Sequence, residues 1–167
     1  MAVKFSNSIG IINLKLSTRG DYAVRALLEL ATEVDQEWLP LAEIAERTGI
    51  SPKYLEQILM RLRTARVVKA KRGAHGGYAF ARPAGEVTIG EVVRAMDGPL
   101  APSLCASRTA HAPCPVYRCP SEEDCVLRGL WVDVRDAISQ VVDATTFGDL
   151  ADRRRQQDSA KREMYHI

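Results

Sequence analysis

Apolar positions between residues 18 and 62 recur at helical spacing in three separate segments. From Thr18, apolar side chains three and four residues apart predict a helix that ends near Val34. A short second helix follows at residues 41–48 and ends at Gly49, a residue suited to a helix C-terminus. Ser51 and Pro52 form a start signal for a third helix that runs to about residue 65. Its predicted buried face carries Leu55, Ile58, Leu59 and Leu62.

The pattern changes after the third helix, where the sequence "VVKAKRGAHGGYAFARP" predicts a β-hairpin with a glycine-rich turn. Thr88 is suited to cap a fourth, short helix. A longer helix with a nearly continuous apolar seam begins after Cys125. This order predicts a mostly α-helical chain: a winged helix-turn-helix domain with a two-stranded wing, followed by a long C-terminal dimerisation helix.

The same pattern divides the chain into five parts. We expect residues 1–13 to be a disordered N-terminal extension and residues 14–98 to form the winged helix-turn-helix domain. Residues 99–125 are predicted to be a cysteine-rich sensor loop. Residues 126–150 would form the dimerisation helix and a following turn, and residues 151–167 a charged tail that frays.

The seam of the long helix predicts an interface with a second copy of the chain. A helix this apolar on one side is not expected to face water, so the seam should be buried against its two-fold mate. The alternative is that the helix packs back on its own domain. The seam consists of Leu130, Trp131, Val134, Ile138 and Val141.

Composition is that of a globular protein, and only the distribution of charge adds information. The 167 residues are 46% apolar and 26% charged, with a net charge of +2. Between Pro52 and Arg72, however, seven residues are basic and one is acidic. A basic patch on a helix-turn-helix and its hairpin predicts binding to double-stranded DNA. The alternative is a merely solvated face.

Particular DNA contacts follow from this placement. Side chains near the start of the second helix of a helix-turn-helix reach base edges, and the hairpin tip reaches phosphates or the minor groove. Gln57 is suited to pair with adenine, whereas Tyr54 is as consistent with the core as with DNA. The candidates are Ser51, Lys53, Tyr54, Gln57, Arg61, Arg72, His75, Gly76 and Gly77.

All four cysteines lie between residues 105 and 125, namely Cys105, Cys114, Cys119 and Cys125. The sequence has no apolar run long enough for a membrane span and no recognisable signal peptide, so we expect a cytoplasmic protein. Thiols stay reduced there, and clustered cysteines favour metal or cluster ligands over structural disulfides. A structural zinc site and a thiol–disulfide switch remain alternatives, although the tight C-x2-C pair of zinc ribbons is absent.

Four blocks of the sequence together resemble the Rrf-two family of bacterial transcription regulators. In order they are "LKLSTRGDYAVRALLELA", "LAEIAERTGISPKYLEQILMRLRTARVVKAKRGAHGGYAFAR", "TIGEVVRAMDG" and "CPSEEDCVLRGLWVDVRDAISQVVDATTFGDL". The family includes a regulator of iron–sulfur-cluster biogenesis, a nitric-oxide-sensing repressor and a repressor of cysteine metabolism. The resemblance implies a homodimer that binds a pseudo-palindromic operator. Relatives usually begin at the position of Leu14, and their wing carries a further glycine or proline at residue 74 or 75.

The resemblance also suggests a ligand set for an iron–sulfur cluster, either [2Fe–2S] or [4Fe–4S]. Cys105, Cys119 and Cys125 match the three cysteines of cluster-binding members. Some members add a histidine where this chain has Arg128, which cannot ligate. The candidates for the fourth ligand are therefore Asp21 from the other subunit, which matches the aspartate of the nitric-oxide sensor, and the extra Cys114.

The resulting hypothesis is a DNA-binding regulator, expected to be a repressor, that senses redox, nitric oxide or iron–sulfur status through its cysteine loop. The alternative is a winged-helix regulator with zinc or thiol–disulfide switching in that loop. An iron–sulfur electron carrier or enzyme is disfavoured, because the sequence contains no recognisable substrate-binding motif. We therefore expect no enzymatic activity, no small-molecule substrate and no membrane partner.

Overall fold

The computed structural model describes residues 16–33, 37–73, 75–114 and 121–164. The described chain divides into two compact units. One contains Leu16–Gly98 together with the chain from Ser139 onward, and the other contains residues 99–138. Residues 1–13, which we predicted to be an extension, lie outside the described residues.

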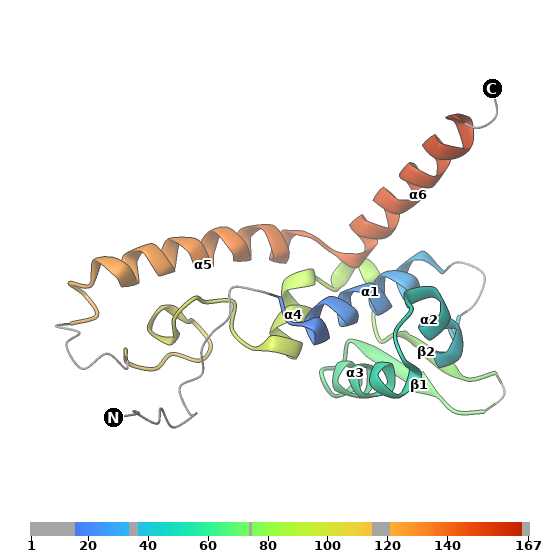
Figure 1. The fold of residues 1–167 in the computed structure, drawn as a ribbon, viewed down its shortest axis with the longest axis horizontal. Helices are drawn as coiled ribbons and strands as arrows, with labels where there is room; N and C mark the ends of the chain where they lie inside the picture. Colours follow the sequence, from blue (N-terminus) through green and yellow to red (C-terminus); the bar gives the residue numbers. More distant parts are fainter. Residues whose placement is uncertain (1–15, 34–36, 74, 115–120, 165–167) are drawn as a thin grey trace, which may run out of the picture. The chain divides into compact units, whose positions relative to one another are not determined.

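Helix α1 (Thr18–Thr32) lies at the centre of the first unit (Figure 1). The Ser17 hydroxyl accepts a hydrogen bond from the Gly20 amide at 3.0 Å and caps the helix. The helix ends two residues before the predicted Val34, which lies outside the described residues. Its buried face, which includes Ala23, Ala26 and Leu27, packs against α2, α3 and α4.

The predicted helix-turn-helix is confirmed as α2 (Leu41–Thr48) and α3 (Pro52–Thr64). Gly49 ends α2 with a φ of +69°, a left-handed conformation that glycine adopts without steric cost. Ser51 occupies the N-cap position of α3 as predicted, but its side chain makes no capping hydrogen bond. Pro52 is the first residue of the helix, where its missing N–H would have no intrahelical partner.

The wing is an antiparallel hairpin of β1 (Val68–Lys71) and β2 (Gly77–Phe80). Lys69 pairs with Ala79 and Lys71 with Gly77. A short 3-10 helix, η1 (Ala84–Glu86), leads into α4 (Ile89–Asp97). The Thr88 hydroxyl accepts from the Glu91 amide at 3.2 Å, which confirms the predicted cap of α4.

The second unit contains the cysteine segment and most of a long helix. A 3-10 turn, η2 (Leu104–Ala106), carries Cys105. Helix α5 (Val126–Ala144) follows the segment, as predicted, and its last turns from Ser139 belong to the first unit.

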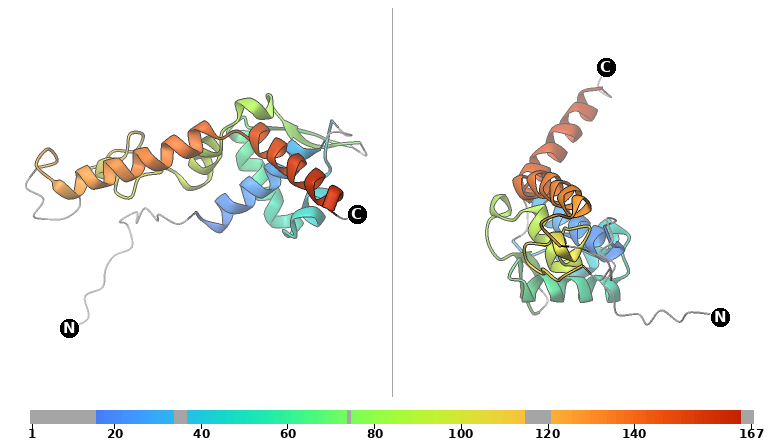
Figure 2. Two further views of the ribbon diagram at one scale, coloured as in Figure 1. Left: turned by 90° about the horizontal axis from the view of Figure 1, so that it is seen from above. Right: turned by 90° about the vertical axis from the view of Figure 1, so that its left-hand side faces the viewer.

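The charged tail predicted to fray is instead helical over its described residues, 151–164, which corrects the sequence-based expectation. Helix α6 (Phe147–Met164) begins beside α1, and its C-terminal part extends away from the unit (Figures 1 and 2). Phe147 and Ala151 are buried at its start, and Arg154 forms an ion pair with Glu29 of α1 at 2.7 Å. This burial and the ion pair hold the first two turns, and the helix then continues with exposed residues.

The predicted architecture of a mostly helical chain with a two-stranded wing is confirmed. Within the described residues, none of the helices is both long enough and apolar enough to cross a membrane.

Candidate DNA-binding surface and cysteine segment

Helix α3 buries one face and exposes the opposite one. The predicted core residues Leu55, Ile58, Leu59 and Leu62 are at most 1% exposed. The other side carries Lys53, Gln57 and Arg61, all exposed, at the four-residue spacing that places them on one stripe. Ser51 is exposed at the start of the helix. The predicted DNA contacts Lys53, Gln57 and Arg61 therefore share one exposed face of α3.

Tyr54 takes a different position, since it is half-buried and packs against the core. Its ring meets that of Tyr22 from α1 edge-on, with 5.9 Å between centroids and an interplanar angle of 75°. The structure therefore gives Tyr54 a packing role that joins the start of α3 to α1. A DNA contact from Tyr54 stays a prediction.

Met60 is an exposed residue of α3 that the sequence reasoning passed over. It is 53% exposed and lies one turn beyond Gln57. The phase of the helix, which buries Leu59 and Leu62, places Met60 on the outside.

The wing tip carries Arg72 and His75, both exposed, and residue 74 lies outside the described residues. Gly76 and Gly77 follow, and each has backbone where a side chain would be. A Cβ on Gly76 would lie 2.2 Å from the carbonyl oxygen of Lys71, and a Cβ on Gly77 would lie 2.4 Å from that of Leu39. These short distances explain from contacts within the chain why both positions are glycine. The predicted close approach of the two glycines to DNA stays a prediction.

A third strand-like segment, which the sequence did not predict, borders the wing. Leu39 and Tyr78 exchange two backbone hydrogen bonds of 3.0 and 2.9 Å. The ring of Trp38 lies beneath two wing lysines, with the ammonium of Lys69 at 4.8 Å and that of Lys71 at 5.7 Å from its centroid. Both distances are within the range of cation–π attraction.

Three of the four cysteines are described, and all three are free thiols. Cys105 is buried, with its sulfur 3.1 Å from the Ser103 hydroxyl oxygen, whereas Cys114 and Cys125 are half-buried. Cys119 lies outside the described residues. Among the described side chains, no three His, Cys, Asp or Glu residues are grouped so that they could hold a metal ion. Cysteine is the usual ligand of iron–sulfur clusters, but the described residues alone do not form such a site, and the set predicted from the resemblance includes Cys119.

Two arginines of α5, seven residues apart, bind the backbone around Cys105. Arg128 donates to the carbonyl oxygen of Cys105 at 3.0 Å, and Arg135 donates to that of Ala106. Arg135 also forms an ion pair with Asp136 at 2.7 Å, and this hydrogen-bonded guanidinium lowers the pKa of the Asp136 carboxyl. Arg128, whose side chain cannot ligate a metal ion, therefore holds the cysteine turn against α5.

The candidate ligand Asp21 lies in the first turn of α1, in the unit that does not contain the cysteines. Its carboxylate accepts from Arg25 at 2.8 Å, and this hydrogen bond raises the pKa of Arg25. Asp21 would have to leave this pair to bind a metal ion.

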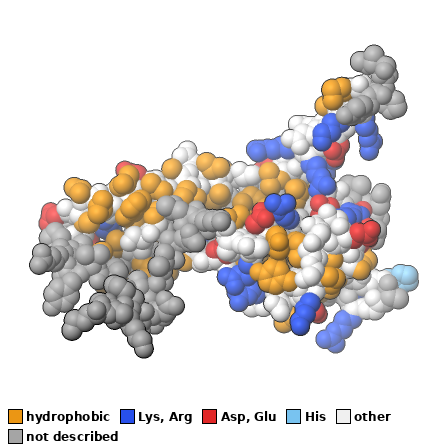
Figure 3. All heavy atoms as spheres, in the orientation of Figure 1, with side chains coloured by type: hydrophobic (Ala, Val, Ile, Leu, Met, Phe, Trp, Pro, Cys, Tyr) orange, Lys and Arg blue, Asp and Glu red, His pale blue; other side chains and the backbone are white. Residues whose placement is uncertain are grey.

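The predicted dimer seam is exposed to a large extent in the single chain. None of the described residues of α5 is buried. Leu130 is 50% and Val141 65% exposed, and Trp131, Val134 and Ile138 are half-buried. Figure 3 shows apolar side chains gathered along this helix.

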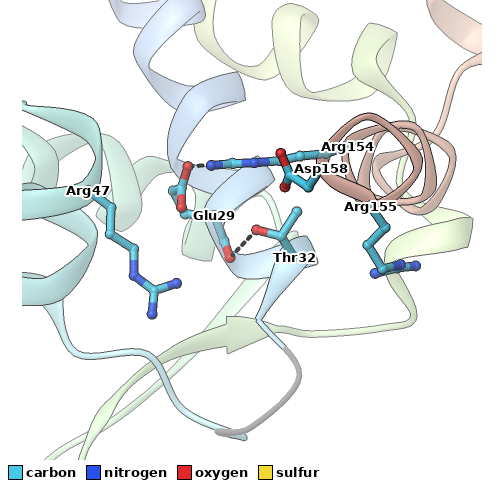
Figure 4. A pocket seen from close by; sticks show the side chains of 6 residues that line it. All are labelled: Glu29, Thr32, Arg47, Arg154, Arg155 and Asp158. Carbon is cyan, nitrogen blue, oxygen red and sulfur yellow. Dashed lines mark hydrogen bonds and ion pairs between the residues drawn. The ribbon is translucent and has the colours of Figure 1, made fainter. Parts of the chain in front are cut away.

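An open, polar pocket of about 430 Å³ lies between α1, α2 and α6 (Figure 4). Its lining includes Glu29, paired with Arg154, and Arg47, which donates to Glu33 at 2.7 Å. These ion pairs link α6 and α2 to the C-terminal half of α1. We assign the pocket a structural role.

Comparison with known proteins identifies relatives that are transcriptional regulators. A family model described as Rrf2, iron-dependent transcriptional regulator, matches residues 16–153. The HTH-type transcriptional regulator IscR of Enterobacter sp. (strain 638) is 33% identical over 153 residues, which cover 92% of this chain and 89% of that protein.

Solved structures give the same result. CymR, the global cysteine regulator of B. subtilis, is 34% identical with a TM-score of 0.68, covering 84% of this chain and 98% of that one. IscR of T. potens is 32% identical with a TM-score of 0.64, covering 86% of this chain and 90% of that one. The match to these regulators confirms the predicted fold class.

Proposed function

The chain belongs to the Rrf2 family of transcriptional regulators, and we propose that it is a homodimeric repressor controlled by an iron–sulfur cluster. Membership confirms the family resemblance and the role of a DNA-binding transcription regulator rather than an enzyme. The cluster, the dimer, the operator contacts and the cytoplasmic location are parts of the proposal.

The DNA-binding part of the proposal rests on the exposed stripe of α3. A recognition helix in the major groove needs side chains that reach bases beside side chains that reach phosphates. Gln57 offers an amide that can bind adenine, and Lys53 and Arg61 on the same stripe offer cations. Arg72 and His75 at the wing tip would reach the backbone or minor groove beside it.

The operator is obtained by selecting bound sequences from a random duplex library with the purified protein. Gln57→Ala should then lose about 1–3 kcal/mol at one operator position and relax the base preference there. Arg72→Ala should weaken binding to all sequences and reduce its salt dependence. Unchanged affinity in both variants would refute this placement of α3 and the wing.

The dimer part of the proposal rests on the exposed apolar face of α5. Side chains such as Leu130 and Val141 recur at helical spacing and are half or more exposed in the single chain. A second copy would remove them from water and would pair two recognition helices on a two-fold operator. Ile138→Glu should yield monomers in sedimentation analysis, whereas Asp133→Glu on the exposed polar side should not. A dimeric Ile138→Glu variant would argue for another interface.

The cluster part of the proposal rests on one observation: every described cysteine is an unpaired thiol in the segment that precedes α5. Cys105, Cys119 and Cys125 would hold the cluster, with Asp21 of the partner subunit or Cys114 as fourth ligand. A bound cluster supplies an iron centre that responds to redox change or nitric oxide. The iron dependence in the family description supports iron over zinc.

Two arginines of α5 would connect the proposed cluster site to the dimer helix. Arg128 and Arg135 tie the turn at Cys105 to α5. A change at the Cys105 thiol that moves this turn would therefore also move α5, the helix proposed to set the dimer geometry. Half-sites lie about 34–36 Å apart, so a small change in the separation of the two recognition helices would reduce affinity.

Absorbance of anaerobically purified protein tests the cofactor. Visible iron–sulfur bands are expected, and Ala at Cys105, Cys119 or Cys125 should abolish them and change operator affinity. A colourless protein that contains zinc, or that forms a disulfide on oxidation, would instead support the alternative switch. Comparing Asp21→Ala with Cys114→Ala identifies the fourth ligand, since the variant that keeps a normal spectrum has lost a residue that does not ligate.

A further inference from the structure

We propose that Trp38 is a positioning residue that holds Lys69 and Lys71 as a phosphate-binding pair on one face of the wing. The inference rests on the proposed operator binding and adds a determinant that lies outside the helix-turn-helix and the hairpin. It follows from the register of the two wing strands and of the segment that pairs with β2 at Leu39, from two small residues between the aromatic ring and the lysines, and from charge.

The register places the three side chains on one face. Leu39 pairs with Tyr78 in antiparallel fashion, so Trp38 lies opposite Ala79. Ala79 pairs in turn with Lys69 of β1. Trp38, Ala79 and Lys69 therefore form one row across the strands, and Lys71 lies on the same face because side chains alternate along a strand.

The residues between the ring and the lysines are small. Ala79 stands between Trp38 and Lys69, and Gly77 is the pairing partner of Lys71. A Cβ on Gly77 would lie 2.4 Å from the Leu39 carbonyl oxygen, so the segment at Leu39 can approach β2 only beside a glycine. Long side chains at these two positions would separate the lysines from the indole. The ammonium groups instead reach 4.8 and 5.7 Å from its centroid.

The charges around Lys69 and Lys71 favour an ordered pair of ammonium groups that can bind a phosphate. Two ammonium groups on one strand face repel each other, and the negative face of the indole offsets part of that repulsion. The Glu37 carboxylate lies 3.7 Å from the ammonium of Lys69, and both side chains are exposed, Glu37 by 74% and Lys69 by 48%. A DNA phosphate would therefore replace Glu37 as the partner of Lys69, while Trp38 keeps both lysines in place.

The test measures operator affinity of the full-length protein as a function of salt. The double substitution Lys69→Met and Lys71→Met should reduce the slope of log K against log salt by about 0.9 for each phosphate that the lysines no longer neutralise. Trp38→Leu should weaken binding about 5-fold through disordered lysines, and Trp38→Phe should restore most of it because the aromatic face returns. Lys161→Met, on exposed α6, is the matched charge control and should leave the slope unchanged.

A double-mutant cycle separates positioning from folding. In the background that lacks both lysines, Trp38→Leu should cost no further affinity; an equal loss in both backgrounds would mean that Trp38 acts only on the fold and would overturn the inference. Glu37→Gln, which leaves the indole intact, should tighten low-salt binding only when Lys69 is present. An equal gain without Lys69, or an unchanged salt slope in the double variant, would also overturn it.

These outcomes are distinct from failure of the proposed function. If the wild-type chain selects no operator, operator binding itself is wrong. If Gln57→Ala relaxes base preference while the lysine variants behave like wild type, operator binding stands and the inference about Trp38 fails.

Discussion

Replacing Phe147 tests whether the junction between α5 and α6 is anchored in the core of the winged-helix unit. Phe147 is fully buried, and its ring lies 5.8 Å from that of Phe80 in β2. Its amide donates to the Val87 carbonyl oxygen at 3.0 Å. Truncating a fully buried phenylalanine to alanine costs about 3–5 kcal/mol, through the loss of apolar burial and the cavity left behind. A domain whose total stability is about 5–15 kcal/mol would thus lose a large fraction of it.

The assay is chemical and thermal unfolding at one fixed protein concentration, because self-association makes the melting temperature concentration-dependent. Phe147→Ala should lower the melting temperature by about 6–20 °C, at about 2–4 °C per kcal/mol for a chain of this size. Met164→Ala is the control: Met164 is 64% exposed near the end of α6 and should change stability by less than about 0.5 kcal/mol. Equal effects of the two substitutions would show that α6 is not anchored as described.

Two further predictions concern the wing and the start of α6. In urea unfolding, Gly77→Ala should destabilise the protein by about 1–3 kcal/mol, because the added Cβ would lie 2.4 Å from a backbone oxygen. Gly85→Ala is the control and should be neutral or slightly stabilising, because an added Cβ there would have no neighbouring atom within 4 Å. Equal effects of the two substitutions would contradict the close approach at Gly77. Hydrogen bonds from the amide and hydroxyl of Thr146 lower the pKa of Asp149, so its contribution is present above the ordinary carboxyl pKa of about 4 and is lost as the pH falls through the lower folded pKa. Melting temperatures between pH 2 and 7 should therefore fall less steeply with acid in Asp149→Asn, and an unchanged acid dependence would contradict this assignment.

The helices and the wing could be predicted because their signals are local. Gly49, Pro52 and Thr88 mark helix ends by backbone preference and capping, and apolar spacing marks the buried faces. The strand-like segment beside β2 could not be predicted in this way. It pairs through a single residue, Leu39, which is too short for an alternating pattern, and its partner Tyr78 is far along the chain.

The wrong expectation for the charged tail has a physical cause. Beyond Ala151 the segment has no apolar stripe, so its pattern indicates a solvated and frayed end. Its helix is anchored by Phe147 in the core and by the ion pair of Arg154 with Glu29 of α1, which is distant in sequence. Pattern reasoning that uses neighbouring residues cannot detect such an anchor.

Some features of the candidate site could also be predicted from local signals, and others could not. Exposure of Lys53, Gln57 and Arg61 follows from helix phase and could be predicted. The hydrogen bonds of Arg128 and Arg135 to the turn at Cys105 could not be predicted. Their acceptors are backbone carbonyl oxygen atoms, which every residue has, so no residue type in the sequence marks them. For Tyr54, periodicity allowed both core and DNA, and its contact with Tyr22 gives it a packing role.

Helix α4 contacts chain segments close to two of the places where the sequence passes from one unit to the other. At its C-terminal end, Asp97 accepts a hydrogen bond from the Ser17 amide at 3.0 Å, and the chain leaves for residues 99–138 directly after Gly98. The chain returns at Ser139, and Asp143 then forms an ion pair with Arg94 of α4. Helix α4 also packs on α1 and on the recognition helix α3, and α6, which follows α5 along the chain, packs on α1 as well. Under the proposed regulation, α4 and α6 are therefore the two elements of the winged-helix unit through which the chain on either side of residues 99–138 meets α1.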